Sequence, residues 1–130
     1  MTLAIVIHSR IITVSVKRNT GDVFDAILQI PPKMLPEAKS TPDGIWEFQG
    51  DNGPSTLKFN ENRELGILDP TYSDSKSKWD IPMRVVENGD LSEISITLNK
   101  PEDVKMDEFE EQVKIVEQRM NELKQILESE

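Results

Sequence analysis

Asp69 and His8 are the residues of this sequence with the clearest potential for acid–base chemistry. His8 is the only histidine, and the sequence places no acid or serine near it that would complete a catalytic triad. We therefore interpret His8 as a surface or strand-end histidine and expect no catalytic residue there. Asp69 points toward the core near a strand end if an alternating pattern runs through residues 65–69. There its carboxylate could orient a ligand or act as a general base, whereas the simpler alternative is a turn with Pro70.

The composition argues against several other kinds of site. The chain has 130 residues with no cysteine and one histidine, so neither a disulfide framework nor a Cys/His zinc site can form. No calcium-loop or glycine-rich phosphate-binding pattern is present, and we expect no metal and no cofactor. The formal net charge of −9 repels phosphate backbones, so nucleic acid is not an expected partner.

The length predicts one domain over residues 1–130. The apolar run at residues 3–7 is too short for a signal peptide or a membrane span. We therefore expect a cytoplasmic protein, and the sequence leaves its oligomeric state open.

The first third of the chain predicts one strand and two short helices. Residues 10–17 alternate between apolar and polar side chains, which is typical of a half-buried strand. Thr20 is the expected N-cap of a helix that continues to Leu28. Pro31 and Pro32 end that helix and begin another short helical turn.

Asn88-Gly89 predicts a two-residue type I′ hairpin turn. In this register Glu87 pairs with Asp90, and one face of the hairpin is almost wholly apolar. The predicted pairs on the apolar face are Val85–Ser92, Met83–Ile94, Ile81–Ile96 and Trp79–Leu98, and Arg84 faces Glu93 on the other face.

An earlier hairpin is predicted around residues 51–54, with Gly50 opposite Ser55. The expected pairs are Phe48–Leu57 and Trp46–Phe59 on the apolar face and Glu47–Lys58 on the other. A turn at residues 61–63 then places Leu65 beside Phe59 and Ile67 beside Leu57, with Gly66 at a bend. Residues 71–78 are polar and predict an exposed loop.

Residues 107–128 predict a long amphipathic helix after Pro101. Asp107 and Glu110 resemble a capping box, and Glu110 with Lys114 suggests an i,i+4 ion pair. The predicted apolar stripe consists of Phe109, Val113, Val116, Met120, Leu123 and Leu127.

The order of these elements resembles the helix-grip SRPBCC superfamily, which includes START-related, polyketide cyclase/dehydrase and pollen-allergen-like proteins. The similar segments are the strand at residues 11–16 that leads into residues 20–27, and the helix at 107–127 that follows the strand containing Thr97. The resemblance implies an α+β fold: a curved antiparallel sheet of about six strands, two short helices after the first strand, and a long C-terminal helix. It also implies an apolar cavity between the sheet and that helix, and the shortness of the chain predicts a small one.

From this resemblance we expect non-catalytic binding or transport of a small apolar ligand, such as a lipid, a polyketide-like molecule or an aromatic compound. Two alternatives remain: a cyclase/dehydratase-type enzyme that uses an inner polar residue, and a protein-interaction domain with a filled core. The residues expected to line the ligand site are Trp46, Phe48, Phe59, Ile67, Trp79, Met83, Phe109, Val113, Val116 and Met120.

Overall fold

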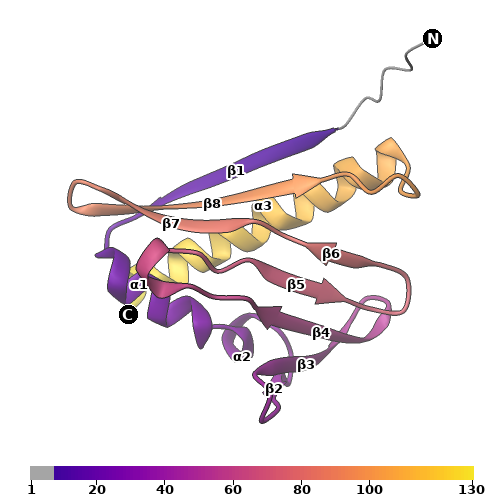
Figure 1. Cartoon of the computed structure of the whole chain (residues 1–130), viewed down its shortest axis with the longest axis horizontal. Helices are drawn as coiled ribbons and strands as arrows, with labels where there is room; N and C mark the ends of the chain where they lie inside the picture. Colours follow the sequence, from indigo (N-terminus) through magenta and orange to yellow (C-terminus); the bar gives the residue numbers. More distant parts are fainter. Residues whose placement is uncertain (1–7) are drawn as a thin grey trace.

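Residues 8–130 are described by a computed structural model of the chain, and they form an α+β fold with eight strands rather than about six (Figure 1). The apolar run predicted at residues 3–7 lies outside the described residues. The strands are β1 (Ser9–Val16), β2 (Lys39–Ser40), β3 (Ile45–Gly50), β4 (Gly53–Phe59), β5 (Pro70–Ser73), β6 (Lys78–Asp80), β7 (Met83–Asn88) and β8 (Leu91–Asn99). The helices are α1 (Thr20–Leu28), α2 (Pro31–Met34), the 3₁₀ helix η1 (Arg63–Leu65) and α3 (Met106–Ser129).

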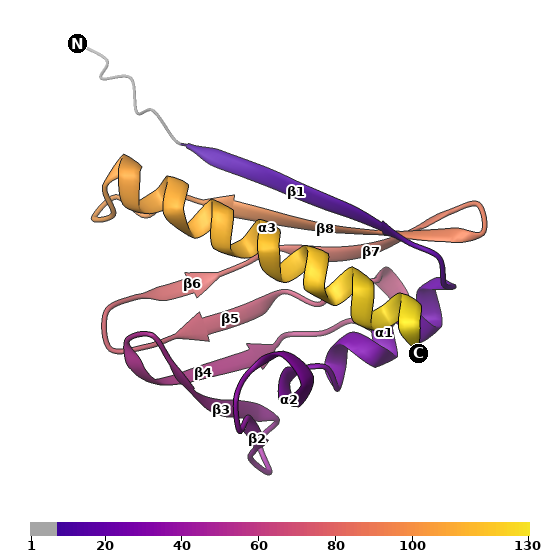
Figure 2. The same cartoon turned by 180° about the vertical axis from the view of Figure 1, so that it is seen from behind.

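The strands form two antiparallel sheets. One has the order β1-β8-β7 and the other the order β2-β3-β4-β5-β6. The sheets meet at the segment before β5, where the Leu68 amide donates to the Met83 carbonyl at 3.0 Å and the Val85 amide donates to the Gly66 carbonyl at 2.9 Å. The long helix α3 runs along the three-stranded sheet, and the five-stranded sheet extends below it in Figure 2.

The strand and the two short helices near the N-terminus are confirmed. The N-cap of α1 is Asn19 rather than Thr20, because Asn19 has extended backbone angles and its Oδ1 accepts from the Asp22 amide at 2.9 Å. Thr20 is already inside the helix. α2 begins at Pro31, where the fixed φ of proline suits a first helical position and no backbone N–H is lost.

The β7–β8 hairpin forms with the predicted faces, but its register was predicted wrongly by two residues. Asn88 lies opposite Leu91, so Gly89 and Asp90 are the two turn residues. Gly89 has a φ of 60° and Asp90 has no positive φ, which suits a turn with glycine first and not the type I′ turn predicted. This register places apolar side chains opposite each other on the buried face, as the pairs Val85–Ile94 and Met83–Ile96.

The remaining β7–β8 predictions change accordingly. Glu87 lies opposite Ser92 and Arg84 opposite Ser95, so neither the predicted Glu87–Asp90 pair nor the Arg84–Glu93 pair exists. Trp79 and Ile81 do not pair with β8. Trp79 belongs to β6 and lies opposite Tyr72 in the other sheet.

The β3–β4 hairpin is shifted by two residues as well. Gly50 lies opposite Gly53, Phe48 opposite Ser55, and Trp46 opposite Leu57. Gly53 has a φ of 95°, so it can follow the two-residue turn directly and begin β4 earlier than predicted. Because the shift is an even number of residues, every side chain stays on the face predicted for it. The predicted Glu47–Lys58 pair is absent, since Glu47 lies opposite Thr56.

The predicted strand through Leu65 and Ile67 is wrong. Arg63–Leu65 forms η1, which begins after Asn62 and ends at Gly66 in a left-handed conformation. Leu65 is 68% exposed and Leu68 is fully buried, so Leu68 is the residue of this segment that enters the core.

The predicted loop at residues 71–78 is also wrong, because half of it forms strands. β5 pairs with β4, which places Tyr72 opposite Leu57 and Pro70 opposite Phe59. β6 pairs in turn with β5, and only residues 74–77 form the turn between them. Thr71 and Ser73 alternate with Tyr72 and therefore lie on the outer face of the sheet, where polar side chains are favoured.

α3 confirms the predicted helix, although its cap differs from the prediction. The N-cap is Lys105, which makes no side-chain capping bond, and Asp107 lies in the first turn. Glu110 pairs with Arg10 of β1 at 2.6 Å and not with Lys114, which instead lies 3.7 Å from Glu111. The Arg10–Glu110 pair therefore links the helix to the first strand.

The C-terminal half of α3 covers the free edge of β1. The Lys124 ammonium donates to the Ser15 carbonyl, and the Lys17 amide donates to the Glu128 carboxylate at 2.9 Å. These side chains occupy backbone groups that an unpaired strand edge would otherwise offer to another chain.

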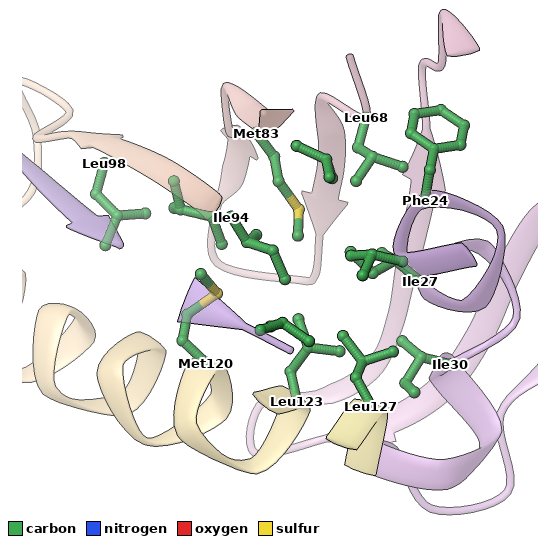
Figure 3. Packing of buried hydrophobic residues seen from close by; sticks show 14 of the residues in the cluster. Phe24, Ile27, Ile30, Leu68, Met83, Ile94, Leu98, Met120, Leu123 and Leu127 are labelled. Atoms are coloured by element: carbon green, nitrogen blue, oxygen red, sulfur yellow. The ribbon is translucent and has the colours of Figure 1, made fainter. Parts of the chain in front are cut away.

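The hydrophobic core lies between α1, the buried face of α3 and the inner face of the three-stranded sheet. Met120, Leu123 and Leu127 of α3 point toward Ile94 of β8 and Ile27 of α1 (Figure 3). Burial of a side chain of this size contributes roughly 1.5–3 kcal/mol. Packing of the predicted stripe is therefore the main stabilising term for α3.

Gly66 and Gly89 allow a matched test of the junction between the sheets. Both have similar positive φ values, 66° and 60°, but a Cβ on Gly66 would lie 2.3 Å from the Val85 carbonyl oxygen, whereas one on Gly89 would meet nothing. We expect Gly89→Ala to lower the free energy of unfolding by about 1 kcal/mol and Gly66→Ala by about 2–4 kcal/mol, measured by urea unfolding. Equal losses in the two variants would contradict the close approach at Gly66.

Candidate functional site

One face of the five-stranded sheet is built largely from aromatic side chains, and we call this set of residues the aromatic face. The pairing places Trp46, Leu57, Tyr72 and Trp79 in one row across four strands. Charged side chains such as Glu47 and Lys58 lie on the opposite face, as alternation along a strand requires. The aromatic face consists of Trp46, Phe48, Leu57, Phe59, Tyr72 and Trp79.

The aromatic face turns toward the interior of the molecule, but the core covers only part of it. Phe59 and Trp79 pack against the core, whereas Trp46 and Leu57 lie outside it. Phe48 is buried, although it is not part of that cluster. Phe48 lies against Tyr72 with ring centroids 6.3 Å apart at a tilt of 45°. Apart from Phe48, the side chains of the face are half-buried, so each keeps a part of its surface exposed.

One residue in the middle of the apolar stripe of α3 is less buried than its neighbours on the stripe. Val113 and Met120 are 5% and 2% exposed, but Val116, which lies between them on the same stripe, is only half-buried. Positions three and four residues apart share a helix face, so a fully packed interface would bury all three side chains. Val116 packs against the core, but it is less well covered than Val113 and Met120 on either side of it.

A short chain of polar groups lies at one end of the aromatic face. The Tyr72 hydroxyl donates to the Asp74 carboxylate at 2.6 Å, and the Ser55 hydroxyl lies 3.4 Å from the Tyr72 hydroxyl. Burial and the bond to Asp74 raise the pKa of Tyr72. The Tyr72 hydroxyl therefore keeps its proton at neutral pH.

Asp74 organises the β5–β6 turn as well as Tyr72. Its other bonds come from the amides of Lys76 and Ser77, at 2.8 and 2.9 Å, and from the side-chain amide of Asn52 at 3.1 Å. Burial raises the pKa of Asp74, but these donors together with Tyr72 outweigh burial and hold the pKa well below its ordinary value. The carboxylate is thus ionised throughout the neutral range.

The structure separates the ten predicted lining residues into groups. Trp46, Phe48, Phe59 and Trp79 share the aromatic face, and Val116 is the half-buried residue in the middle of the α3 stripe. The members that are fully enclosed in the core are Met83, Phe109, Val113 and Met120. Ile67 bridges to Asn62 and Arg84 outside the core.

Two residues of the aromatic face were missed as lining residues. Leu57 was assigned to the apolar side of its strand but not to the ligand site. Tyr72 was missed because residues 71–78 were read as a loop. The signal that could have found it is alternation, since Tyr72 stands between the polar residues Thr71 and Ser73.

Asp69 does not point into an apolar space, which was one of its two alternatives. Its φ is 35°, and its carboxylate pairs with Arg84 and accepts from the Met83 amide at 3.0 Å. The carboxylate therefore ties the segment before β5 to β7. His8 precedes β1, and its carbonyl accepts from the Lys100 amide at 2.9 Å.

Two hollows in the surface lie away from the aromatic face. One, of about 300 Å³, lies between α1, η1 and β7, and the other, of about 350 Å³, lies beside α1 and the end of α3. Both have charged walls, which suit an apolar ligand poorly. None of the ten predicted lining residues borders either hollow. The predicted ligand site therefore stays a prediction. The charged residues on their walls are Arg63, Glu64 and Glu87 in the first and Arg18, Asp22, Asp25, Lys33 and Glu130 in the second.

Residues 8–130 contain no cluster of three or more histidine, aspartate or glutamate side chains that could hold a metal ion. Within the same range, no helix is both long and apolar enough to cross a membrane.

Comparison with known proteins identifies the fold. No family model matches the sequence, and no curated protein matches it. Solved structures do match. A protein of unknown function from Bacillus thuringiensis has a TM-score of 0.70 at 14% identity, over 94% of this chain and 97% of that one.

Two further matches have known names. Ara h 8.0201 has a TM-score of 0.66 at 16% identity, over 95% of this chain and 96% of that one. A norcoclaurine synthase point mutant from Thalictrum flavum has a TM-score of 0.65 at 16% identity, over 97% of both chains. The chain therefore has the helix-grip fold that its sequence predicts.

The bonds of Asp74 predict an acid-dependent loss of stability. Because the pKa of Asp74 is lower in the folded chain than in the unfolded one, its stabilising contribution is complete above about pH 4 and is lost as the pH falls below that value. We expect Asp74→Asn to lower the free energy of unfolding at pH 7 by about 1–3 kcal/mol. Urea unfolding measured between pH 7 and pH 2.5 should show that the difference in free energy of unfolding between the variant and the unmodified chain becomes smaller as the pH falls.

Asp43→Asn, at an exposed position outside the hydrogen bonds described above, is the matched control and should change stability by less than about 0.5 kcal/mol. The proposed role of the carboxylate would be contradicted if the difference in free energy of unfolding between Asp74→Asn and the unmodified chain stayed constant down to the lowest pH.

Proposed function

We propose that this chain binds a small apolar ligand, aromatic or otherwise flat, between the aromatic face and the middle of α3. The observation that carries the proposal is the position of Trp46 and Leu57, which share a sheet face with the core-packed Phe59 and Trp79 yet lie outside the core. Apolar surface of this kind, rimmed by a few polar groups, is typical of a ligand site. The half-buried Val116 offers the facing wall.

The solved structures with this fold support the same proposal. The matched norcoclaurine synthase is described in complex with a transition-state analogue, so the fold can hold a small organic molecule in at least that protein. Another match is a di-domain aromatase/cyclase from steffimycin biosynthesis, of which this chain covers 44%. At 16% identity these proteins say nothing about which ligand this chain takes.

The expected affinity follows from the size of the ligand. A drug-sized ligand gains roughly 0.3 kcal/mol per heavy atom, so one of about 20 atoms gains about 6 kcal/mol. This corresponds to a Kd of roughly 40 μM. Stacking on Trp46 or Trp79 would add about 0.5–1.5 kcal/mol.

The two tryptophans of the chain provide a direct measurement. Trp46 and Trp79 are its only tryptophans, and both belong to the aromatic face. We expect titration with the uncharged probe N-phenyl-1-naphthylamine to quench tryptophan emission and to raise probe emission with one saturable curve. Native mass spectrometry of the purified protein would additionally show any ligand that is retained.

Neighbouring residues on β4 provide matched variants for this titration. Leu57→Asn changes the aromatic face and should weaken probe binding about tenfold, since it removes apolar contact worth about 1.4 kcal/mol. Thr56→Asn lies on the opposite face of the same strand and should leave the Kd unchanged. Equal effects of the two variants would place the probe somewhere else.

A filling variant on α3 separates an open site from a packed one. Val116→Phe should weaken probe binding at least tenfold with little loss of thermal stability if the space beside it is open. Ile115→Phe, at a 38% exposed position on the preceding residue, is the control and should change neither property. A large drop in Tm for Val116→Phe together with no probe binding by the unmodified chain would favour the alternative of an interaction domain with a filled core.

A further inference from the structure

The hydroxyl of Tyr72 is the polar group best placed to select among ligands of the aromatic face. Tyr72 lies in the row between Leu57 and Trp79, so its ring is part of the apolar surface. Its hydroxyl lies at the end of that surface beside Asp74 and Ser55. A ligand stacked on the ring therefore brings one edge close to this oxygen.

The hydrogen-bond partners of Tyr72 determine what its oxygen can still do. The Tyr72 proton is committed to the Asp74 carboxylate at 2.6 Å, since an ionised carboxylate can only accept. The Ser55 hydroxyl donates to the Gly53 carbonyl at 3.0 Å, so the 3.4 Å contact between the two hydroxyls has no proton to share. The lone pairs of the Tyr72 oxygen are therefore left to accept a hydrogen bond from elsewhere.

The surroundings of Tyr72 also carry negative charge. Asp74 and Asp51 both raise the pKa of Tyr72 by charge repulsion, after the larger effects of burial and hydrogen bonding. A negative group brought to the same place would meet the same repulsion. Glycine at position 50 leaves room for the two hydroxyls. A Cβ there would lie 2.7 Å from the Ser55 oxygen and 3.6 Å from the Tyr72 oxygen.

We propose that the Tyr72 oxygen accepts a hydrogen bond from the ligand, which is therefore an apolar or aromatic molecule with a neutral hydroxyl or an N–H group. Phenols, alcohols and aromatic amines belong to this class, whereas carboxylates such as free fatty acids are disfavoured by the negative charges of Asp74 and Asp51. The inference rests on the proposed function, since it specifies the chemistry at one end of the same site.

Three naphthalene probes test this selectivity on the unmodified chain. 2-Naphthol carries a donor, 2-methoxynaphthalene has the same ring without a donor, and 2-naphthoate carries a negative charge. In displacement of N-phenyl-1-naphthylamine at pH 7, 2-naphthol should bind about 5–10 times more tightly than 2-methoxynaphthalene, as one net hydrogen bond provides. 2-Naphthoate should bind most weakly of the three.

Two variants then assign the selectivity to the residues involved. Tyr72→Phe keeps the ring and removes the oxygen, so the preference for 2-naphthol should disappear while 2-methoxynaphthalene binds as before. Asp74→Asn removes the charge, so the Kd of 2-naphthoate should approach that of 2-methoxynaphthalene.

The outcomes distinguish this inference from the proposed function. If none of the naphthalene probes binds, the proposed function fails and the inference fails with it. If all three bind equally, or if 2-naphthoate binds best, the site exists but Tyr72 does not select its ligand. The comparison on the unmodified chain decides this even if Tyr72→Phe does not fold. A preference for 2-naphthol that survives in a folded Tyr72→Phe variant would also overturn the inference.

Discussion

The junction between the two sheets is the constraint on which the rest of the structure depends. Gly66 approaches the backbone of Val85 so closely that no side chain fits there, and the next residues form backbone bonds to β7. Leu68 is fully buried and anchors the segment in the core. Asp69 then holds a positive φ, which is sustained by its bonds to Arg84 and to the Met83 amide. The chain leaves this point as β5, and the direction of β5 positions the whole five-stranded sheet.

This junction divides the molecule into a packed part and a partly open part. α3 has 24 residues and extends about 36 Å, enough to pass both. Both of its ends complete the core with α1 and the three-stranded sheet, through Phe109 at one end and Leu127 at the other, whereas Val116 in the middle is half-buried. Trp46 and Leu57 of the aromatic face lie outside the core. Stability thus depends on both ends of the helix, and the proposed binding site depends on its middle.

The sequence predicts the faces of this fold better than its registers. Alternation assigned the side chains of both hairpins to the correct faces, and a register error of two residues does not change a face. The register errors came from the turns. Gly53 and Gly89 each adopt a positive φ, and the hairpin rules allow a glycine at more than one position of a short turn. The strand at residues 70–73 has a short local signal, the alternation around Tyr72, but its pairing with β4 and the contacts of Asp69 with β7 depend on distant residues. The loop prediction removed Tyr72 from the predicted site, and the predicted strand through Leu65 and Ile67 gave rise to the alternative of an inward Asp69.

Tyr72 and Asp74 connect the stability of the sheet to the proposed ligand preference. Asp74 orders the β5–β6 turn through two backbone amides, and the same carboxylate accepts a hydrogen bond from the Tyr72 hydroxyl. One group therefore both closes the turn and leaves the Tyr72 oxygen as an acceptor on an apolar surface. A substitution at Asp74 cannot change the polarity of this oxygen without also loosening the turn that positions it. A different ligand preference is thus more easily reached by changing the apolar residues that surround Tyr72, such as Leu57, because their contacts do not hold the turn.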